Sequence, residues 1–92
     1  MGEAEVKEFG KYIVADPRIC HGQLTFRGTR ILVQTVLEQV STGREWNEIV
    51  QSWGGKVPFE AITDAVLLAR DVLLSHHRTW RKEAISRLAT TA

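Results

Sequence analysis

Residues 20–33, which read CHGQLTFRGTRILV, decide the fold of this chain. A short β-branched and aromatic run, Leu24–Phe26, is followed by Gly28 and then by the first amphipathic helical pattern. Because glycine tolerates a positive φ without a Cβ clash, we expect the extended segment to bend sharply at Gly28 and to continue as a helix. The bend holds two long cations, Arg27 and Arg30.

These two arginines allow two interpretations. The guanidinium group offers five donors in a rigid fork that suits carboxylates and phosphates. In the first interpretation, Arg27 and Arg30 stabilise the bend by pairing with acids such as Asp16 or Glu38. In the second, they face an anionic partner. Arginines near tight turns are usually solvated or paired locally, so the residues alone favour the first interpretation.

The segment before the bend predicts a small β-ribbon. Lys11–Ala15 and Leu24–Phe26 have the composition of short strands, and Asp16-Pro17 ends the first of them. Residues 1–10 are polar and lack a period, so we expect them to be flexible. A lone two-stranded ribbon is barely stable in water, and it must therefore pack on helices or pair with a second chain.

The segment after the bend predicts three amphipathic helices. The first ends at Ser41–Gly43, the second ends at Gly54-Gly55, and Pro58 suits the first turn of the third. A third helix over residues 59–87 would be about 43 Å long, so its distal half should project, dock on another chain or fray. The apolar stripes are Val33, Val36, Leu37 and Val40, then Trp46, Ile49, Val50 and Trp53, then Ile62, Ala65, Val66, Ala69, Val72 and Leu73.

These patterns together predict a mainly α fold. A short N-terminal β-ribbon precedes a three-helix domain with a helix-turn-helix outline and a long C-terminal helix. We divide the chain into a flexible N-terminus (1–10), the ribbon and helical domain (11–75), and a basic amphipathic helical tail (76–92).

Composition narrows the class of protein. Isolated folding of 92 residues is marginal, which favours a homodimer or a partner complex. A single cysteine excludes an internal disulfide and suits a reducing compartment. We see no apolar run near the ~20 residues of a membrane span and no leader, so we expect a cytoplasmic protein without a membrane role. The net charge is +1, with an excess of cations in the tail.

Two adjacent pairs carry reactive side chains. Cys20 and His21 are neighbours on a predicted loop, whereas a nucleophile and its base need hydrogen-bond reach and an orienting third group. Successive helical residues point about 100° apart, so His76 and His77 do not converge on a metal. We therefore predict no enzyme activity, metal or cofactor, and keep a small hydrolase using Cys20 and His21 as a third alternative.

Several short motifs resemble one known family. They are Ile19–Gly22, Thr25–Val33, Gly43 and Phe59–Ile62, followed by an alanine-rich helix. In this order they resemble domain-of-unknown-function family 433, small prokaryotic proteins grouped with VapB-type antitoxins. The resemblance covers about residues 11–75.

The family departs from this chain at two positions, since it usually has prolines where Leu24 and Leu32 stand, and the path into the first helix is expected to differ. The resemblance implies a DNA-binding antitoxin of a type II toxin–antitoxin pair. Such a protein represses its own operon by binding its operator as a dimer, and it neutralises a toxin, commonly a PIN-like ribonuclease. The alternative is a protein–protein interaction module that uses the third helix and the tail and does not bind DNA.

The candidate residues for the two activities lie in different parts of the chain. The start of the third helix carries Glu60 and Asp64, which repel phosphate, so cations elsewhere must contact DNA. Leu67 and Leu74 form a second apolar face, which is covered by the ribbon or the first helix, or else by another chain. The DNA-binding candidates are Arg27, Thr29, Arg30, Arg44 and Lys56. The partner-binding candidates are Leu67, Leu74, His77, Trp80, Arg81, Ala84 and Leu88.

Overall fold

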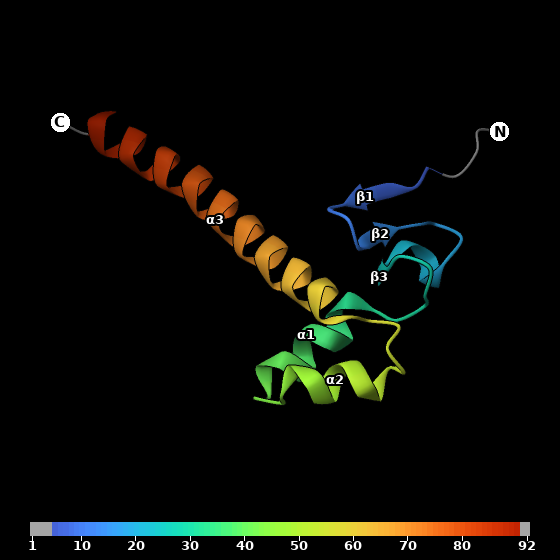
Figure 1. The fold of residues 1–92 in the computed structure, drawn as a ribbon. Helices are drawn as coiled ribbons and strands as arrows, with labels where there is room; N and C mark the ends of the chain where they lie inside the picture. The colour runs from blue at the N-terminus through green and yellow to red at the C-terminus, as the bar shows by residue number, and fades with distance from the viewer. Residues whose placement is uncertain (1–4, 91–92) are drawn as a thin grey trace.

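A small N-terminal sheet and two short helices form a body from which one long helix projects (Figure 1). The computed structural model describes residues 5–90. The fold class is the predicted one: mainly α, with β-structure at the N-terminus and a long C-terminal helix. The elements are β1 (Lys7–Phe9), β2 (Ile13–Ala15), the 3-10 turn η1 (Cys20–Gly22), β3 (Leu24–Phe26), α1 (Val33–Ser41), α2 (Trp46–Ser52) and α3 (Phe59–Thr90).

The sheet has one strand more than the predicted ribbon. β1, β2 and β3 pair antiparallel in chain order, with Phe9 opposite Ile13 and Ile13 opposite Phe26. The predicted flexibility was wrong for Lys7–Phe9, which forms β1, while residues 1–4 lie outside the described residues. The strand predicted at Lys11–Ala15 is shorter, because its first two residues belong to the turn that brings β1 back onto β2.

The turn between β1 and β2 rests on α3. Gly10 has a φ of +72°, and a Cβ at this position would lie 2.7 Å from Asp64 Oδ2. The same carboxylate accepts a hydrogen bond of 3.4 Å from the backbone N–H of Tyr12. Only glycine fits this approach without displacing Asp64, so the turn fixes the sheet against α3.

The hydrophobic core lies where the sheet, α1, α2 and the first turns of α3 meet. The stripes predicted for the first two helices face it, with Val36 and Ile49 fully buried. Full burial stabilises each such side chain by about 1.5–3 kcal/mol relative to exposure. The largest apolar side chains that are fully buried are Phe26, Val36, Ile49, Val57 and Ile62.

The long helix α3 is covered only near its start. Ala61, Ile62 and Ala65 are buried, but Val72 and Leu73 are 69% and 68% exposed. These two residues, the last of the apolar stripe predicted on this helix, are therefore not covered by the described chain, because the body is too short to reach them. The radius of gyration is 17.3 Å, whereas a compact chain of this length has about 12 Å. Within residues 5–90, no helix combines the length and the apolar character that crossing a bilayer requires.

Replacing one covered and one exposed isoleucine of α3 by alanine tests whether only the first part of the helix belongs to the folding core. Ile62→Ala should lower the free energy of unfolding by about 3 kcal/mol, because the Ile62 side chain is 0% exposed and its removal leaves a cavity in the core. Ile85→Ala, at a position 54% exposed on the same helix, should change it by no more than about 0.5 kcal/mol. Urea denaturation followed by circular dichroism measures both; equal losses would show that the distal half of α3 belongs to the folding core.

Candidate functional site

The bend between β3 and α1 is held by Thr29. Gly28 has the predicted positive φ, +76°, and the backbone N–H of Thr29 donates to the Phe26 carbonyl at 3.0 Å. The Thr29 hydroxyl donates to the same carbonyl at 2.8 Å and accepts from the N–H of Ile31 at 3.0 Å. This hydroxyl, predicted to contact phosphate, is thus engaged by the bend itself.

Arg27 ties the bend to the first hairpin. Its Nε donates to the Lys11 carbonyl and its Nη1 donates to Glu8 Oε1, both at 3.1 Å. The first interpretation of the two arginines therefore holds for Arg27, but the acid is Glu8 rather than Asp16 or Glu38. An exposed ion pair of this kind contributes about 0–1 kcal/mol, so it positions the guanidinium more than it stabilises the fold.

Asp16 is occupied by a nearer arginine. Arg18 Nε and Nη2 donate to its two carboxylate oxygens at 3.0 and 3.1 Å, and the Arg18 backbone N–H adds a bond of 2.9 Å. The Arg18 side-chain hydrogen bonds, with the backbone bond, hold the pKa of Asp16 below its ordinary value despite partial burial. Asp16 therefore pairs with Arg18 and not with the arginines of the bend.

Arg30 and Lys56 come together from distant parts of the sequence. They line one open groove of about 660 Å³, the cation groove, with Thr29, Leu32, Thr35 and Trp53. Across the described chain, Arg30 and Lys56 take part in none of the ion pairs that the structure contains. The second interpretation, an arginine free to face an anion, thus suits Arg30.

The remaining predicted cation lies apart from this groove. Arg44 is in the loop between α1 and α2, where its Nε lies 3.8 Å from Glu48 Oε2. The structure thus brings together three of the five DNA-binding candidates, Thr29, Arg30 and Lys56, and places Arg27 and Arg44 beside carboxylates.

An apolar groove lies in the angle between the sheet and α3. We call this feature of about 540 Å³ the α3 groove. Its walls come from both sides of the angle that Figure 1 shows, and almost all the side chains are apolar, with His76 at one end. Its lining includes Phe9, Leu24, Leu37, Leu68, Val72 and Leu73.

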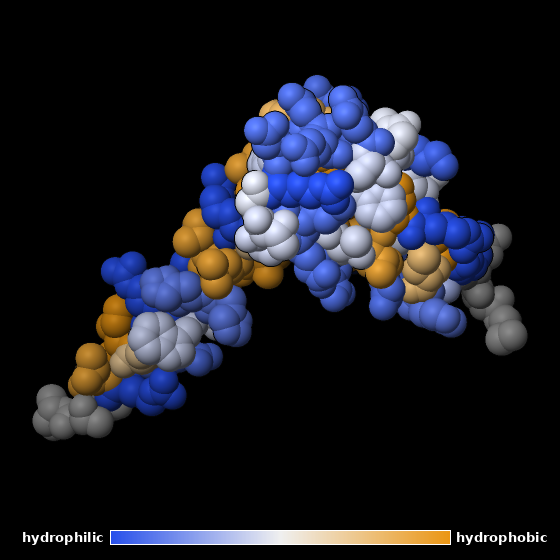
Figure 2. Space-filling model, turned by 90° about the horizontal axis from the view of Figure 1, so that it is seen from below, coloured by the Kyte–Doolittle hydropathy of each residue, from blue (hydrophilic) through white to orange (hydrophobic). Residues whose placement is uncertain are grey.

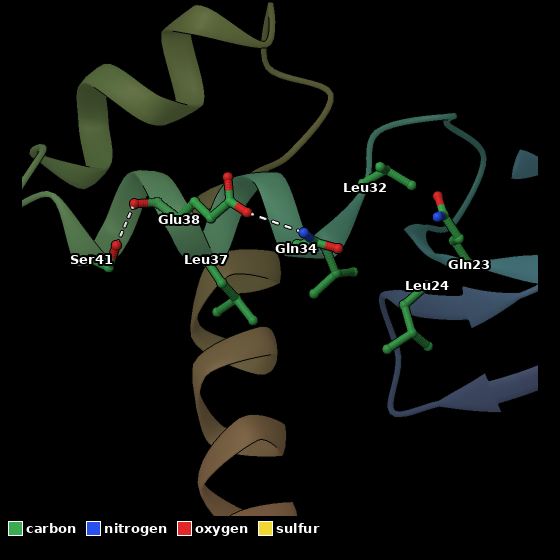
Figure 3. A pocket seen from close by; sticks show the side chains of 8 residues that line it. Gln23, Leu24, Leu32, Gln34, Leu37, Glu38 and Ser41 are labelled. Carbon is green, nitrogen blue, oxygen red and sulfur yellow. Dashed lines mark hydrogen bonds between the residues drawn. The ribbon is translucent and has the colours of Figure 1, made fainter.

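A second groove continues the first along α1. It measures about 510 Å³ and shares Leu24, Val33 and Leu37 with the α3 groove. Figure 3 shows Leu37 pointing from α1 along the start of α3, with Leu24 facing the same opening from the sheet. Polar contacts line its other side, where Gln34 Nε2 donates to Glu38 Oε1 at 3.2 Å. Together the two grooves expose a continuous apolar surface.

The predicted partner-binding residues lie on one continuous helix and divide into two rows. The first row, which we call the outer row, has residues seven apart and therefore nearly in line along α3. Its members are Leu67, Leu74 and Arg81. The second row lies closer to the α3 groove and comprises His77, Trp80, Ala84 and Leu88. Figure 2 shows hydrophobic surface along α3 both beside the body and toward its C-terminal end.

Sequence reasoning missed part of this exposed surface. Ile85, Val72 and Leu73 are all more than half exposed, and none of them was among the partner-binding candidates. The signal for Ile85 was available, since it lies eleven residues after Leu74, a spacing that returns to almost the same face of a helix.

The two reactive pairs have separate surroundings. The Cys20 thiol donates to the Arg30 carbonyl at 3.6 Å, and Cys20 and His21 adopt positive φ values of 50° and 58° in η1. On α3, His76 borders the α3 groove, whereas the His77 ring stacks on Trp80 with centroids 5.9 Å apart. The two imidazoles therefore have different neighbours, as their adjacent positions predicted.

A family match covers most of the body. The family model described as "Protein of unknown function (DUF433)" matches residues 13–67. The chain belongs to this family. In this DUF433 chain the matched region contains the bend at Gly28 and both cations of the cation groove, and it ends before the distal half of α3. No curated protein and no solved structure matched the chain.

The pairing of Asp16 predicts a pH-dependent stability. Because the pKa of Asp16 is lowered by folding, its contribution to the free energy of unfolding is complete above the unfolded pKa of about 4 and is lost as pH falls through the folded pKa. Asp16→Asn should therefore be less stable than the unchanged chain at pH 7, with the difference narrowing at pH 3. Urea midpoints at the two pH values measure this, and Arg18→Gln should reproduce the narrowing; a constant difference would contradict it.

Proposed function

We propose that this DUF433 protein is a DNA-binding antitoxin of a type II toxin–antitoxin pair, acting in the cytoplasm. It represses its own operon and neutralises a toxin of the PIN-like ribonuclease class. The observation that carries the proposal is the division of one chain into a body with a cation groove and a projecting helix with exposed apolar rows. An antitoxin needs both parts, one for the operator and one for the toxin.

The projecting helix supports the toxin-binding half. The leucines Leu67 and Leu74 of the outer row are 42% and 41% exposed. An amphipathic helix with anchors at such intervals is a common way of filling an apolar groove on another protein. Arg81 in the outer row adds a guanidinium group, which is enriched where interfaces carry most of their binding energy.

The cation groove supports the DNA-binding half. Arg30 and Lys56 are exposed, and their side chains form no ion pair with the described acids. Asp64, one of the two acids that would repel phosphate at the start of α3, is directed to the β1–β2 turn. Two cations per chain make few phosphate contacts, so operator binding requires at least two copies of the chain.

The alternative is an interaction module without DNA binding. It is favoured by the carboxylates beside Arg27 and Arg44, which leave only two of the predicted cations free of acids. Glu60 in the first turn of α3 also stays exposed where a helix-turn-helix protein would approach DNA. The two functions share the projecting helix and differ only in the role of the body.

Salt dependence of DNA binding separates the two functions. Replacing Arg30 and Lys56 by alanine removes two phosphate contacts per chain, so the slope of log K against log salt should become shallower by about 1.8 per chain bound. Fluorescence anisotropy with DNA from upstream of the protein's own coding sequence, and with a scrambled duplex, measures the slope and the preference.

The matched control removes the same charge from Arg27 and Arg44, which lie beside acids. It should change the slope much less than the first variant does. Absence of any preference for the upstream DNA at all salt concentrations would remove the DNA-binding half, and an equal change of slope in the two variants would dismiss the cation groove as its site.

Binding to the protein encoded by the adjacent reading frame tests the toxin-binding half of the proposal. Leu74→Asp places a charge in the middle of the outer row and should weaken the complex by about 100-fold, as loss of an interface anchor does. Ser86→Asp adds the same charge off that row and should leave the affinity within about threefold. Isothermal titration calorimetry compares the variants; unchanged binding by Leu74→Asp would exclude the outer row.

A further inference from the structure

No segment between residues 5 and 90 fills the α3 groove, and the groove has no role in the proposed function. It is bounded by β-strand residues such as Phe9 and Leu24 on one side and by Leu68, Val72 and Leu73 on the other. Apolar surface of this extent on a small protein usually contacts another macromolecule. Three properties of the chain identify that macromolecule.

The first property is the amount of exposed surface. The accessible surface of the chain is 7002 Å². A compact chain of 10.4 kDa exposes only about 5,400 Å². If the surplus of about 1,600 Å² is buried on each of two copies, the interface totals about 3,200 Å², which is typical of homodimers that fold and function as pairs.

The second property is a row of residues on α3 whose spacing is symmetric: the steps between its members are the same when they are counted from either end. Its steps are four, four, seven, four and four residues, so its midpoint falls between His76 and His77. The first three members line the α3 groove, and the last three lie on the projecting half. The row, which we call the paired row, consists of Ala65, Ala69, Leu73, Trp80, Ala84 and Leu88.

The third property is the separation of charge along α3. The half that packs on the body is acidic and the projecting half is basic. Antiparallel pairing of two copies places unlike halves side by side, whereas parallel pairing would place the two basic halves together. The acidic half carries Glu60, Asp64 and Asp71 against Arg70, and the basic half carries Arg78, Arg81, Lys82 and Arg87 against Glu83.

We propose that the α3 groove receives the projecting half of α3 from a second copy of this chain. The two helices run antiparallel around a two-fold axis between His76 and His77, so Ala69 lies opposite the second copy's Ala84 and Leu73 opposite its Trp80. Each copy contributes one groove and one helix, which is the self-complementary arrangement that closes a dimer. Small residues opposite each other let the helices approach, and the indole fills the apolar angle.

This inference goes beyond the proposed function and does not require it. The outer row lies to one side of the paired row, so Leu67, Leu74 and Arg81 stay accessible to another protein in the dimer. Purified chain alone suffices for the test, and a failure of DNA or toxin binding leaves its result unchanged.

Sedimentation equilibrium of the full chain is the first measurement. The unchanged protein should have twice the mass of 10.4 kDa at about 100 µM. Trp80→Glu should raise the dissociation constant of the dimer by about 100-fold or more, because it buries a charge in the groove. Ile85→Glu is the matched control: the side chain is similarly exposed, at 54% against 56%, and it lies off the paired row, so the dimer should persist.

Chemical cross-linking is the second measurement, and it reports the direction of pairing. In a Cys20→Ser background, Ala69→Cys and Ala84→Cys chains are prepared separately and treated with a short bis-maleimide. The mixture should cross-link and each chain alone should not, because identical positions lie about 22 Å apart along antiparallel helices.

Three outcomes would overturn the proposal. They are a monomer at every concentration, equal dissociation by Trp80→Glu and Ile85→Glu, and efficient cross-linking of either cysteine variant alone, which would indicate parallel helices. Circular dichroism of each variant shows whether its fold is intact, and the cross-linking result does not depend on the glutamate variants.

Discussion

The structure depends on a mismatch between the length of α3 and the size of the body that covers it. Phe26 and Ile62 are buried where the sheet meets the start of α3, and the helix then continues as far as Thr90. A body of this size has no further residues with which to cover Val72 and Leu73. The chain therefore leaves these apolar side chains exposed to water. Contact with another chain would remove them from water.

Much of the fold was predictable because local signals agreed with it. The stripes through Val36 and Ile49 mark the core faces of the first two helices, and Gly28 adopts the positive φ that the turn from strand to helix requires. These features depend on neighbouring residues, whose relation the sequence records directly. The length of α3 was predictable for the same reason, since no glycine or proline interrupts residues 59–90.

The features that escaped prediction depend on residues far apart in the sequence. β1 had too little β-branched character to be recognised, and it forms because Gly10 lets the turn rest on Asp64, more than fifty residues later. Glu8 was likewise not foreseen as the partner of Arg27, since the strand that presents it was missing from the prediction. The cation groove joins Arg30 to Lys56 across α1 and α2, a juxtaposition that local spacing does not encode.

The continuity of α3 across residue 75 also limits how this protein can change during evolution. Because no break separates the covered half from the projecting half, inserting one residue between them would rotate every distal side chain by about 100° and advance it by about 1.5 Å. The side chains of the projecting half would then point in a different direction from those of the covered half with which they were aligned. Insertions or deletions of about seven, eleven or eighteen residues restore their alignment, so relatives with the same use of this helix should differ in length here by such steps or not at all.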